Sequence, residues 1–246
     1  MWPFRRIGDY MKPILHIPFF EIGIKNYIYG DAVLALAKTA DRCAKKYRIP
    51  VLFIAPYADI RRVAENTDHL IILAPYMDTL KPGRGMADVL PESIKAAGAK
   101  GVVINHCERP LSLSAIVLTI ERARQLDLLS FVCAGSVSEA RAIAQFAPDI
   151  INPEPPELIG TGKTCSEAFI REVTRAIHEI SPHTLIELAA GITSGRQVYD
   201  LVYAGAQAVG VSSGILNAKD PHSMVEEMIS NMRHACDDLS RKGKIS

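Results

Sequence analysis

Three residues that lie far apart in the chain could together carry out acid–base chemistry: Glu154, His106 and Lys25. Glu154 lies in I-I-N-P-E-P-P-E, directly after an apolar segment and between prolines, which fix φ and cannot donate to a sheet. A carboxylate on such a restricted backbone suits a general base. This segment alone is equally compatible with a glutamate that only caps or solvates a connection between a strand and a helix.

His106 follows a second apolar segment and precedes a predicted helix, in Asn105-His106-Cys107-Glu108-Arg109. A single histidine in such a place is usually a structural hydrogen-bonding residue. With a carboxylate and a lysine after other strands, His106 is better explained as an electrophile. The N-terminal end of a helix disfavours imidazolium, so a neutral His106 would donate a hydrogen bond to a carbonyl oxygen. Glu108 would pair with a cation or face solvent, and Asn105 is a secondary candidate.

Three short loops that contain glycine and hydroxyl residues are candidates for phosphate binding. Glycine lets backbone N–H groups approach an anion closely, although these loops could also form only tight turns. The sequence lacks G-x-x-x-x-G-K-[ST], which excludes a nucleotide P-loop. It also lacks metal-ligand spacing, so neither a metal nor another cofactor is expected. The phosphate candidates are Gly160, Thr161, Gly162, Gly191, Ile192, Ser212, Ser213 and Gly214.

The elements that must position these residues alternate between strands and helices. Short apolar segments predict strands, and apolar residues at helical spacing between them predict helices. The predicted strands are residues 14–20, 51–55, 69–74, 101–105, 129–133, 150–152, 184–188 and 208–211. The predicted helices are residues 31–47, 58–65, 90–97, 111–126, 138–146, 166–180, 195–204 and 221–239.

Eight strand–helix units in 246 residues predict an α/β protein with a closed (β/α)8 barrel, also called a TIM barrel. The alternative is an open doubly wound sheet, but no G-x-G-x-x-G follows the first strand. We expect one barrel domain over residues 12–246, with residues 1–11 as an N-terminal extension. In such a barrel the active site lies at the C-terminal ends of the strands, and phosphate binds after the last two strands. This placement favours phosphate binding for the glycine loops.

Composition argues against several other classes of protein. The chain is 48% hydrophobic with a formal net charge of +1, which gives no support for a nucleic-acid or anionic-membrane partner. No apolar run approaches the ~18–20 residues of a membrane span. The five cysteines are odd in number and lack C-x-x-C spacing, which predicts reduced thiols in a cytoplasmic protein.

Several motifs resemble the triosephosphate isomerase family, in particular its shorter archaeal form. N-H-C-E-R at 105–109 is similar to the family motif (N/G)-H-S-E-x, with Cys107 where serine is usual. E-P-P-E-L-I-G-T-G at 154–162 is similar to the archaeal segment that carries the base and the lid. The similarity covers most of the chain from the second predicted strand onward, and includes V-L-P-E-S-I-K-A-A-G-A at 89–99, F-V-C-A at 131–134, A-A-G-I-T-S-G at 189–195 and S-S-G-I-L-N-A-K-D-P at 212–221.

The resemblance implies aldose–ketose isomerisation of a small phosphosugar through an enediolate, most directly a triose phosphate in glycolysis and gluconeogenesis, or else a tetrose or pentose phosphate. The known mechanism of this family assigns a glutamate base, a neutral histidine and a closing loop. Transferred to this chain, those roles fall on Glu154, His106 and residues 160–162, with a lysine after the first strand to stabilise negative charge. The resemblance also implies a homodimer or homotetramer. The alternative is a non-catalytic phosphate-binding barrel with a regulatory or assembly role.

The first strand departs from the family pattern. The family normally carries N-x-K where this strand ends, but the chain has P-F-F-E at 18–21. A lysine follows a few residues later, in G-I-K-N-Y at 23–27. We hypothesise that Lys25 reaches the site by this longer route. In the alternative, Lys25 is a solvated loop residue and Glu21 occupies the floor of the pocket.

Overall fold

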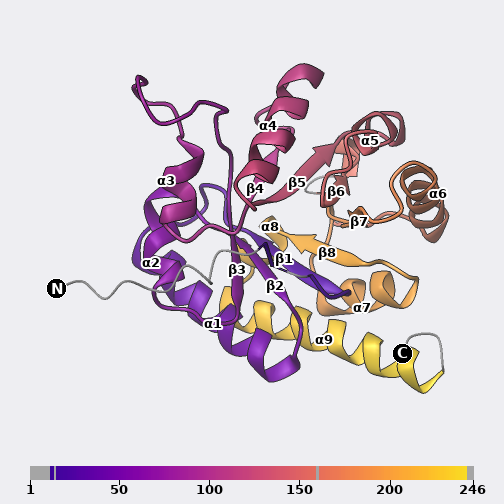
Figure 1. Ribbon diagram of the computed structural model, residues 1–246. Coiled ribbons are helices and arrows are strands. Elements are labelled where there is room, and N and C mark those ends of the chain that lie inside the picture. The colour runs from indigo at the N-terminus through magenta and orange to yellow at the C-terminus, as the bar shows by residue number, and fades with distance from the viewer. Residues whose placement is uncertain (1–11, 14, 159–160, 243–246) are drawn as a thin grey trace.

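Eight parallel strands form one sheet that closes on itself (Figure 1). The computed structural model of the protein describes residues 12–13, 15–158 and 161–242. The strand order is β7-β6-β5-β4-β3-β2-β1-β8, and its two ends join where Leu188 pairs in parallel with Val209. This closure confirms the (β/α)8 barrel and excludes the open sheet. The strands are β1 (Phe19–Gly23), β2 (Val51–Ile54), β3 (Leu70–Ala74), β4 (Gly101–Ile104), β5 (Leu129–Ala134), β6 (Ile150–Pro153), β7 (Leu185–Ile186) and β8 (Ala208–Val211).

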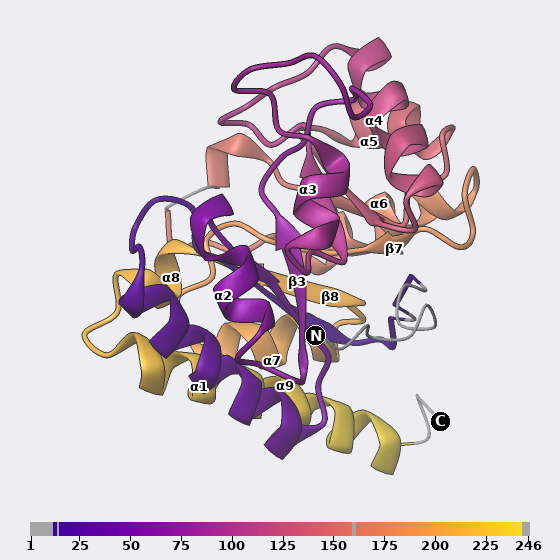
Figure 2. The same ribbon diagram turned by 60° about the vertical axis from the view of Figure 1, so that its left-hand side comes forward.

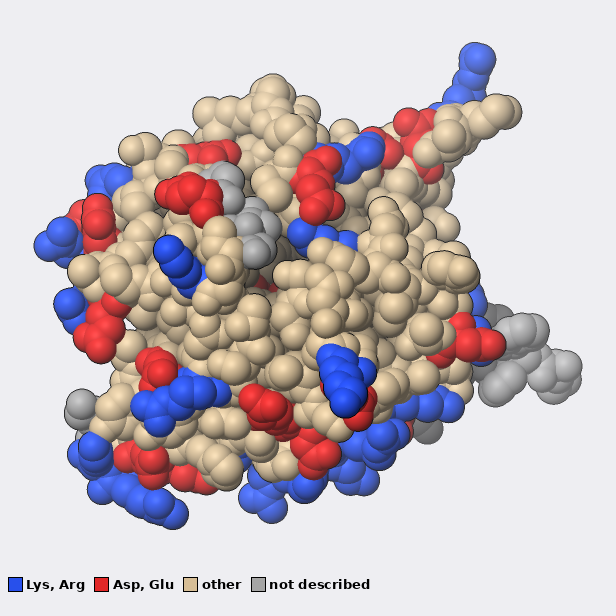
Figure 3. Space-filling model, turned by 180° about the vertical axis from the view of Figure 1, so that it is seen from behind, with Lys and Arg blue, Asp and Glu red and all other residues tan. Residues whose placement is uncertain are grey.

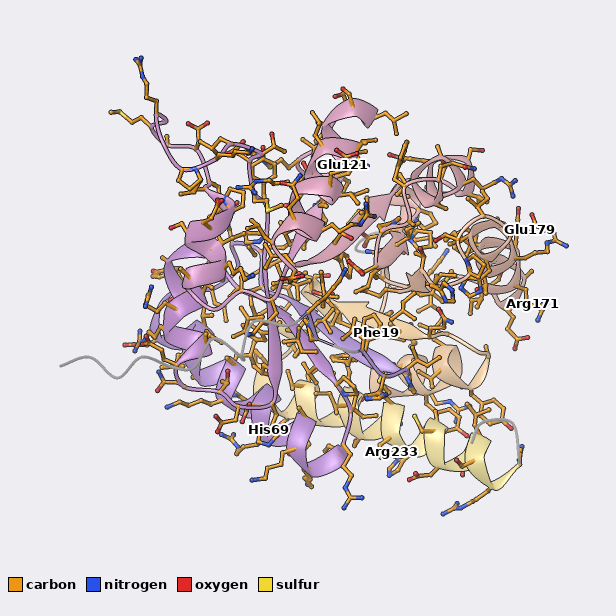
Figure 4. The ribbon with its side chains drawn as sticks, viewed as in Figure 1. Phe19, His69, Glu121, Arg171, Glu179 and Arg233 are labelled. Carbon is orange, nitrogen blue, oxygen red and sulfur yellow. The ribbon has the colours of Figure 1, made fainter. Side chains whose placement is uncertain are left out.

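Helices follow the strands and cover the outside of the barrel (Figures 1 and 2). In α6, apolar residues three and four positions apart face the barrel, while Arg171 and Glu179 lie on its outer side (Figure 4). Among the described residues, no helix is long and apolar enough to cross a membrane. The helices are α1 (Asp31–Tyr47), α2 (Ile60–Ala64), α3 (Pro91–Ala96), α4 (Leu113–Gln125), α5 (Val137–Ala144), α6 (Glu167–His178), α7 (Gly195–Tyr203), α8 (Ser213–Leu216) and α9 (Pro221–Arg241), with 3-10 turns η1 (Tyr57–Asp59) and η2 (Pro156–Leu158).

Apolar side chains fill much of the barrel interior. Phe19 is fully buried near the centre of the molecule (Figure 4). Because the interior is packed and is not a pore, chemistry is confined to the end of the barrel where the strands terminate. The interior cluster comprises Phe19, Leu52, Leu73, Val103, Phe131, Cys133, Ile150 and Ala208.

The main differences from the sequence-based prediction are at β1, β7 and α8, and most other element ends differ by a few residues. The first strand was predicted at 14–20, but β1 is Phe19–Gly23, so Glu21 lies within the strand and not after it. Leu15 packs against the interior cluster without joining the sheet, and Ile17 is 53% exposed, so the sheet begins only at Phe19. β7 is shorter than predicted, and the short helix α8 begins where a loop was expected. Residues 1–11 lie outside the described residues.

Candidate active site

Three strands bring the predicted catalytic residues to the same end of the barrel. Lys25 lies two residues beyond β1, His106 two residues beyond β4, and Glu154 directly after β6. The Glu154 N–H donates to the Ala134 carbonyl at 2.9 Å, so sheet hydrogen bonding holds this backbone beyond the end of its strand. The space-filling view from behind shows a hollow bordered by acidic and basic side chains (Figure 3).

The Lys25 ammonium reaches the loop that carries His106. Lys25 Nζ donates to Glu108 Oε1 at 2.8 Å, and the lysine side chain is 26% exposed. Burial would lower the pKa of Lys25, but the hydrogen bond with Glu108 and the negative charge of Glu154 raise it above the ordinary lysine value. Lys25 therefore carries a positive charge at neutral pH. Its φ of 49° costs roughly 1–2 kcal/mol for an L residue, and strain of this kind is concentrated at functional sites.

Glu154 is a largely buried carboxylate in the field of two opposite charges. Burial raises the pKa of Glu154 above the ordinary glutamate value, the Lys25 charge lowers it, and the Glu108 charge raises it again. The net direction is upward. A higher pKa makes an ionised carboxylate a stronger base, which suits the removal of a proton from carbon.

The His106 ring is held in one neutral tautomer. The backbone N–H of Glu108 donates to His106 Nδ1 at 3.1 Å, so Nδ1 is the unprotonated nitrogen and the proton lies on Nε2. Burial lowers the pKa of His106, and the adjacent Lys25 charge lowers it further, while Glu108 raises it. The ring is thus neutral at pH 7 and can donate a hydrogen bond from Nε2.

The side-chain amide of Asn105 is hydrogen-bonded to the protein through both its nitrogen and its oxygen, and holds the loop after β4 in place. Its Nδ2 donates to the Cys133 carbonyl at 3.0 Å and to Glu139 Oε1 at 2.8 Å, while its Oδ1 accepts from the Leu111 N–H at 2.9 Å. Its φ of 60° turns the chain directly after β4. Glu139 was missed in the sequence analysis, where the available signal was the capping-box pattern S-x-x-E at 136–139.

Two carboxyl groups lie inside the barrel near these residues. Glu21 projects from β1 and is 5% exposed, and Glu187 follows β7 and is fully buried. Sequence reasoning named Glu21 as a possible pocket floor but missed Glu187. The signal for Glu187 was one charged residue in the otherwise apolar run T-L-I-E-L-A-A at 184–190.

The three candidate phosphate loops pack against one another. A side chain at Gly191, where φ is 69°, would collide with the Lys163 carbonyl of the loop after β6. A side chain at Gly214 would collide with the Ile192 carbonyl of the loop after β7. These glycines therefore permit close approach of backbone to backbone. Gly160 lies outside the described residues.

Comparison with known proteins places the chain in a family. The model of the family described as triosephosphate isomerase matches residues 22–228. The triosephosphate isomerase of Saccharolobus solfataricus is 36% identical over 229 residues, which cover 92% of this chain and 99% of that one. The enzyme of that name from Sulfurisphaera tokodaii is 35% identical, with 92% and 99% coverage, and the one from Methanothermus fervidus is 32% identical, with 87% and 99% coverage. The chain therefore belongs to the triosephosphate isomerase family and is an isomerase, not a non-catalytic phosphate-binding barrel.

Proposed function

We propose that the protein interconverts glyceraldehyde 3-phosphate and dihydroxyacetone phosphate through an enediolate, with Glu154, His106 and Lys25 as its catalytic residues. The observation that carries this proposal is the meeting of these three groups at one end of the barrel, where the Lys25 charge acts on both Glu154 and His106. The relatives from Saccharolobus solfataricus and Sulfurisphaera tokodaii are named triosephosphate isomerase, which is this activity.

Each of the three residues has one task in the reaction. Ionised Glu154 takes a proton from the carbon next to the carbonyl, and His106 Nε2–H donates a hydrogen bond to the carbonyl oxygen as it gains negative charge. Lys25 stabilises the same charge electrostatically. Protonated Glu154 then returns the proton to the neighbouring carbon, and the hydroxyl proton passes from one substrate oxygen to the other. One proton on carbon and one on oxygen have then changed places, with no net gain or loss of atoms.

We propose that backbone N–H groups after β6, β7 and β8 hold the phosphate. The close packing of these loops supports this role because it brings the backbone of all three loops into one region. Ser212 Oγ is buried without a hydrogen-bond partner in the described residues, so it has capacity for a ligand. The proposed phosphate-binding residues are Thr161, Gly162, Gly191, Ile192, Ser212, Ser213 and Gly214, with Gly160 as a further candidate from the sequence.

We also propose a cytoplasmic homodimer or homotetramer. The connection from β3 to α3 extends away from the barrel and exposes 94% of Met86, an apolar side chain that a second subunit could cover (Figure 1). All five cysteines are free thiols, as suits a reducing compartment. Sedimentation velocity of the purified chain measures the oligomeric state directly, and a monomer at micromolar concentration would contradict this part of the proposal.

Solvent exchange tests the proposed reaction. The wild-type protein should convert glyceraldehyde 3-phosphate and incorporate deuterium from D2O at the carbon that is reprotonated, because the proton on Glu154 exchanges with solvent. Glu154→Asp withdraws the base by about 1 Å and should slow turnover ~10²-fold. Glu121→Asp is the matched control, since Glu121 is an exposed carboxylate on α4, outside the proposed site. Absence of turnover and exchange with triose phosphates, together with activity on a tetrose or pentose phosphate, would reassign the substrate.

A further inference from the structure

Two buried carboxyl groups share one small region inside the barrel. Glu21 belongs to β1, which pairs with β8 so that Glu21 lies opposite Gly210. A side chain at Gly210 would collide with Glu187 Oε1 and would place its Cβ 2.6 Å from Glu21 Oε2. The two carboxyl groups therefore pack over the same glycine, and the missing side chain makes room for both.

No cation neutralises this pair within the part of the chain that the structure describes. No ion pair there includes Glu21 or Glu187, and the nearby Lys25 ammonium bonds to Glu108 instead. Glu21 Oε1 and both carboxyl oxygens of Glu187 are buried without a hydrogen-bond partner. The described residues also contain no group of three or more side chains suited to hold a metal ion. Two adjacent buried carboxylates without a cation cannot both stay ionised, so the pair holds at least one proton.

Glu21 is the member of the pair that faces the catalytic residues. Its Oε1 lies 3.0 Å from the position that a Cβ on Gly23 would occupy, so the carboxyl group extends to the last residue of β1. Because Gly23 has no side chain, the Glu21 carboxyl group fills the space beside this residue, two positions before Lys25 in the chain. Glu21 also retains slight exposure, whereas Glu187 has none.

The surrounding charges favour the protonated form of both groups. Burial raises the pKa of Glu21 well above the ordinary value, Glu154 raises it further, and Lys25 lowers it. Burial likewise raises the pKa of Glu187, and the charges of Glu21 and Glu154 add to that effect. The neighbouring Cys133 is also buried, which raises its pKa and leaves it an uncharged thiol.

We propose that Glu21 is a neutral carboxylic acid that donates a hydrogen bond to the substrate oxygen on which negative charge develops, and that Glu187 is the positioning residue that keeps the proton in this pair. The inference rests on the proposed isomerase reaction. A protonated carboxyl group donates its O–H without giving up the proton, so the step needs no further reactant. Glu21 would then act beside His106 and Lys25 as a third source of stabilisation for the enediolate.

Kinetics of paired substitutions at Glu21 test the donor role. Glu21→Leu keeps the approximate size but removes the donor, and should lower kcat by ~10²–10³-fold, with a smaller change in KM because the phosphate loops are untouched. Glu21→Gln retains an N–H donor and should keep at least about ten times the kcat of Glu21→Leu. Glu92→Leu is the control, because Glu92 bonds to Arg122 between α3 and α4 and should affect stability without affecting kcat. The proposal would be overturned if Glu21→Leu had the same kcat as Glu92→Leu, or if Glu21→Leu and Glu21→Gln had equal kcat values. Thermal unfolding establishes that each variant is folded.

Infrared spectroscopy tests the proton independently of catalysis. At pH 7 the wild-type protein should show a protonated-carboxyl C=O stretch that shifts in D2O and is missing from the double variant Glu21→Gln/Glu187→Gln. Identical spectra in this region would mean that both carboxyl groups are ionised, and the proposal would fail even for an active isomerase. A wild-type protein that has this band but turns over no phosphosugar would instead contradict the proposed function.

Discussion

Replacing Lys25 by methionine would remove one positive charge from the site and leave most of the aliphatic side chain. The ammonium donates to Glu108 Oε1 at 2.8 Å and acts electrostatically on Glu154 and His106. Glu108 is 64% exposed, so water can solvate its carboxylate once the lysine charge is gone. The cost of the substitution should therefore appear in the transition state and not in the stability of the fold.

The size of the effect follows from the charge and its partial burial. A unit charge about 4 Å from a developing oxyanion contributes about 4 kcal/mol at an effective dielectric constant of about 20. Loss of one preorganised donor typically costs about 2.7–4 kcal/mol, or ~10²–10³ in rate. Because the Lys25 side chain is 26% exposed, solvent screens part of its field. We expect a loss of ~10²-fold in kcat/KM, at the lower end of that range.

Steady-state kinetics with glyceraldehyde 3-phosphate measure this loss. Lys46→Met is the matched control, because Lys46 also bonds to a glutamate, Glu226 at 2.6 Å, but on the outer surface of the barrel. Such exposed pairs contribute little, so the control should stay within about twofold of wild type. Lys25→Arg keeps the charge and should retain more activity than Lys25→Met. Equal kcat/KM values for Lys25→Met and Lys46→Met would refute the electrostatic role of Lys25.

Three further predictions concern pH and stability. Glu154 must be ionised to act as a base, and its pKa is raised above 4.5. As the pH is lowered, kcat/KM should therefore begin to fall while the pH is still above 4.5. A pH–rate profile that stays flat down to pH 4.5 would contradict this prediction. The pKa of Glu187 is raised in the folded state, so its tendency to ionise opposes folding at pH values above its unfolded-state pKa. Glu187→Gln removes this opposition and should raise the unfolding temperature more at pH 8 than at pH 5. An equal increase in unfolding temperature at both pH values would contradict a raised pKa for Glu187. Asn105→Ala leaves buried hydrogen-bonding groups without partners. In urea denaturation it should lower the free energy of unfolding by about 2–4 kcal/mol. The exposed control Asn66→Ala should lower it by less than about 0.5 kcal/mol.

The sequence alone determined the architecture because its signals are local. Short apolar strands and amphipathic helices repeat eight times, and this alternation together with the chain length predicts a parallel barrel. The segment N-P-E-P-P-E likewise placed Glu154 at the end of β6. Element ends were less accurate. The first apolar run contains Leu15, which packs against the interior without joining the sheet. The hydrophobic pattern alone does not distinguish such a residue from a strand residue.

Tertiary structure alone decided which charged groups meet. Lys25 and Glu108 are separated by 83 positions in the chain, and no local pattern predicts that their side chains form a hydrogen bond. The pairing of Glu21 with Glu187 over Gly210 depends on the closure of the barrel, which brings β1, β7 and β8 together. The charge state of each group also depends on its burial and on its neighbours, and both are properties of the folded chain. The sequence therefore determined the barrel and the position of the proposed base, while the folded structure paired Lys25 with Glu108 and placed Glu21 and Glu187 over Gly210.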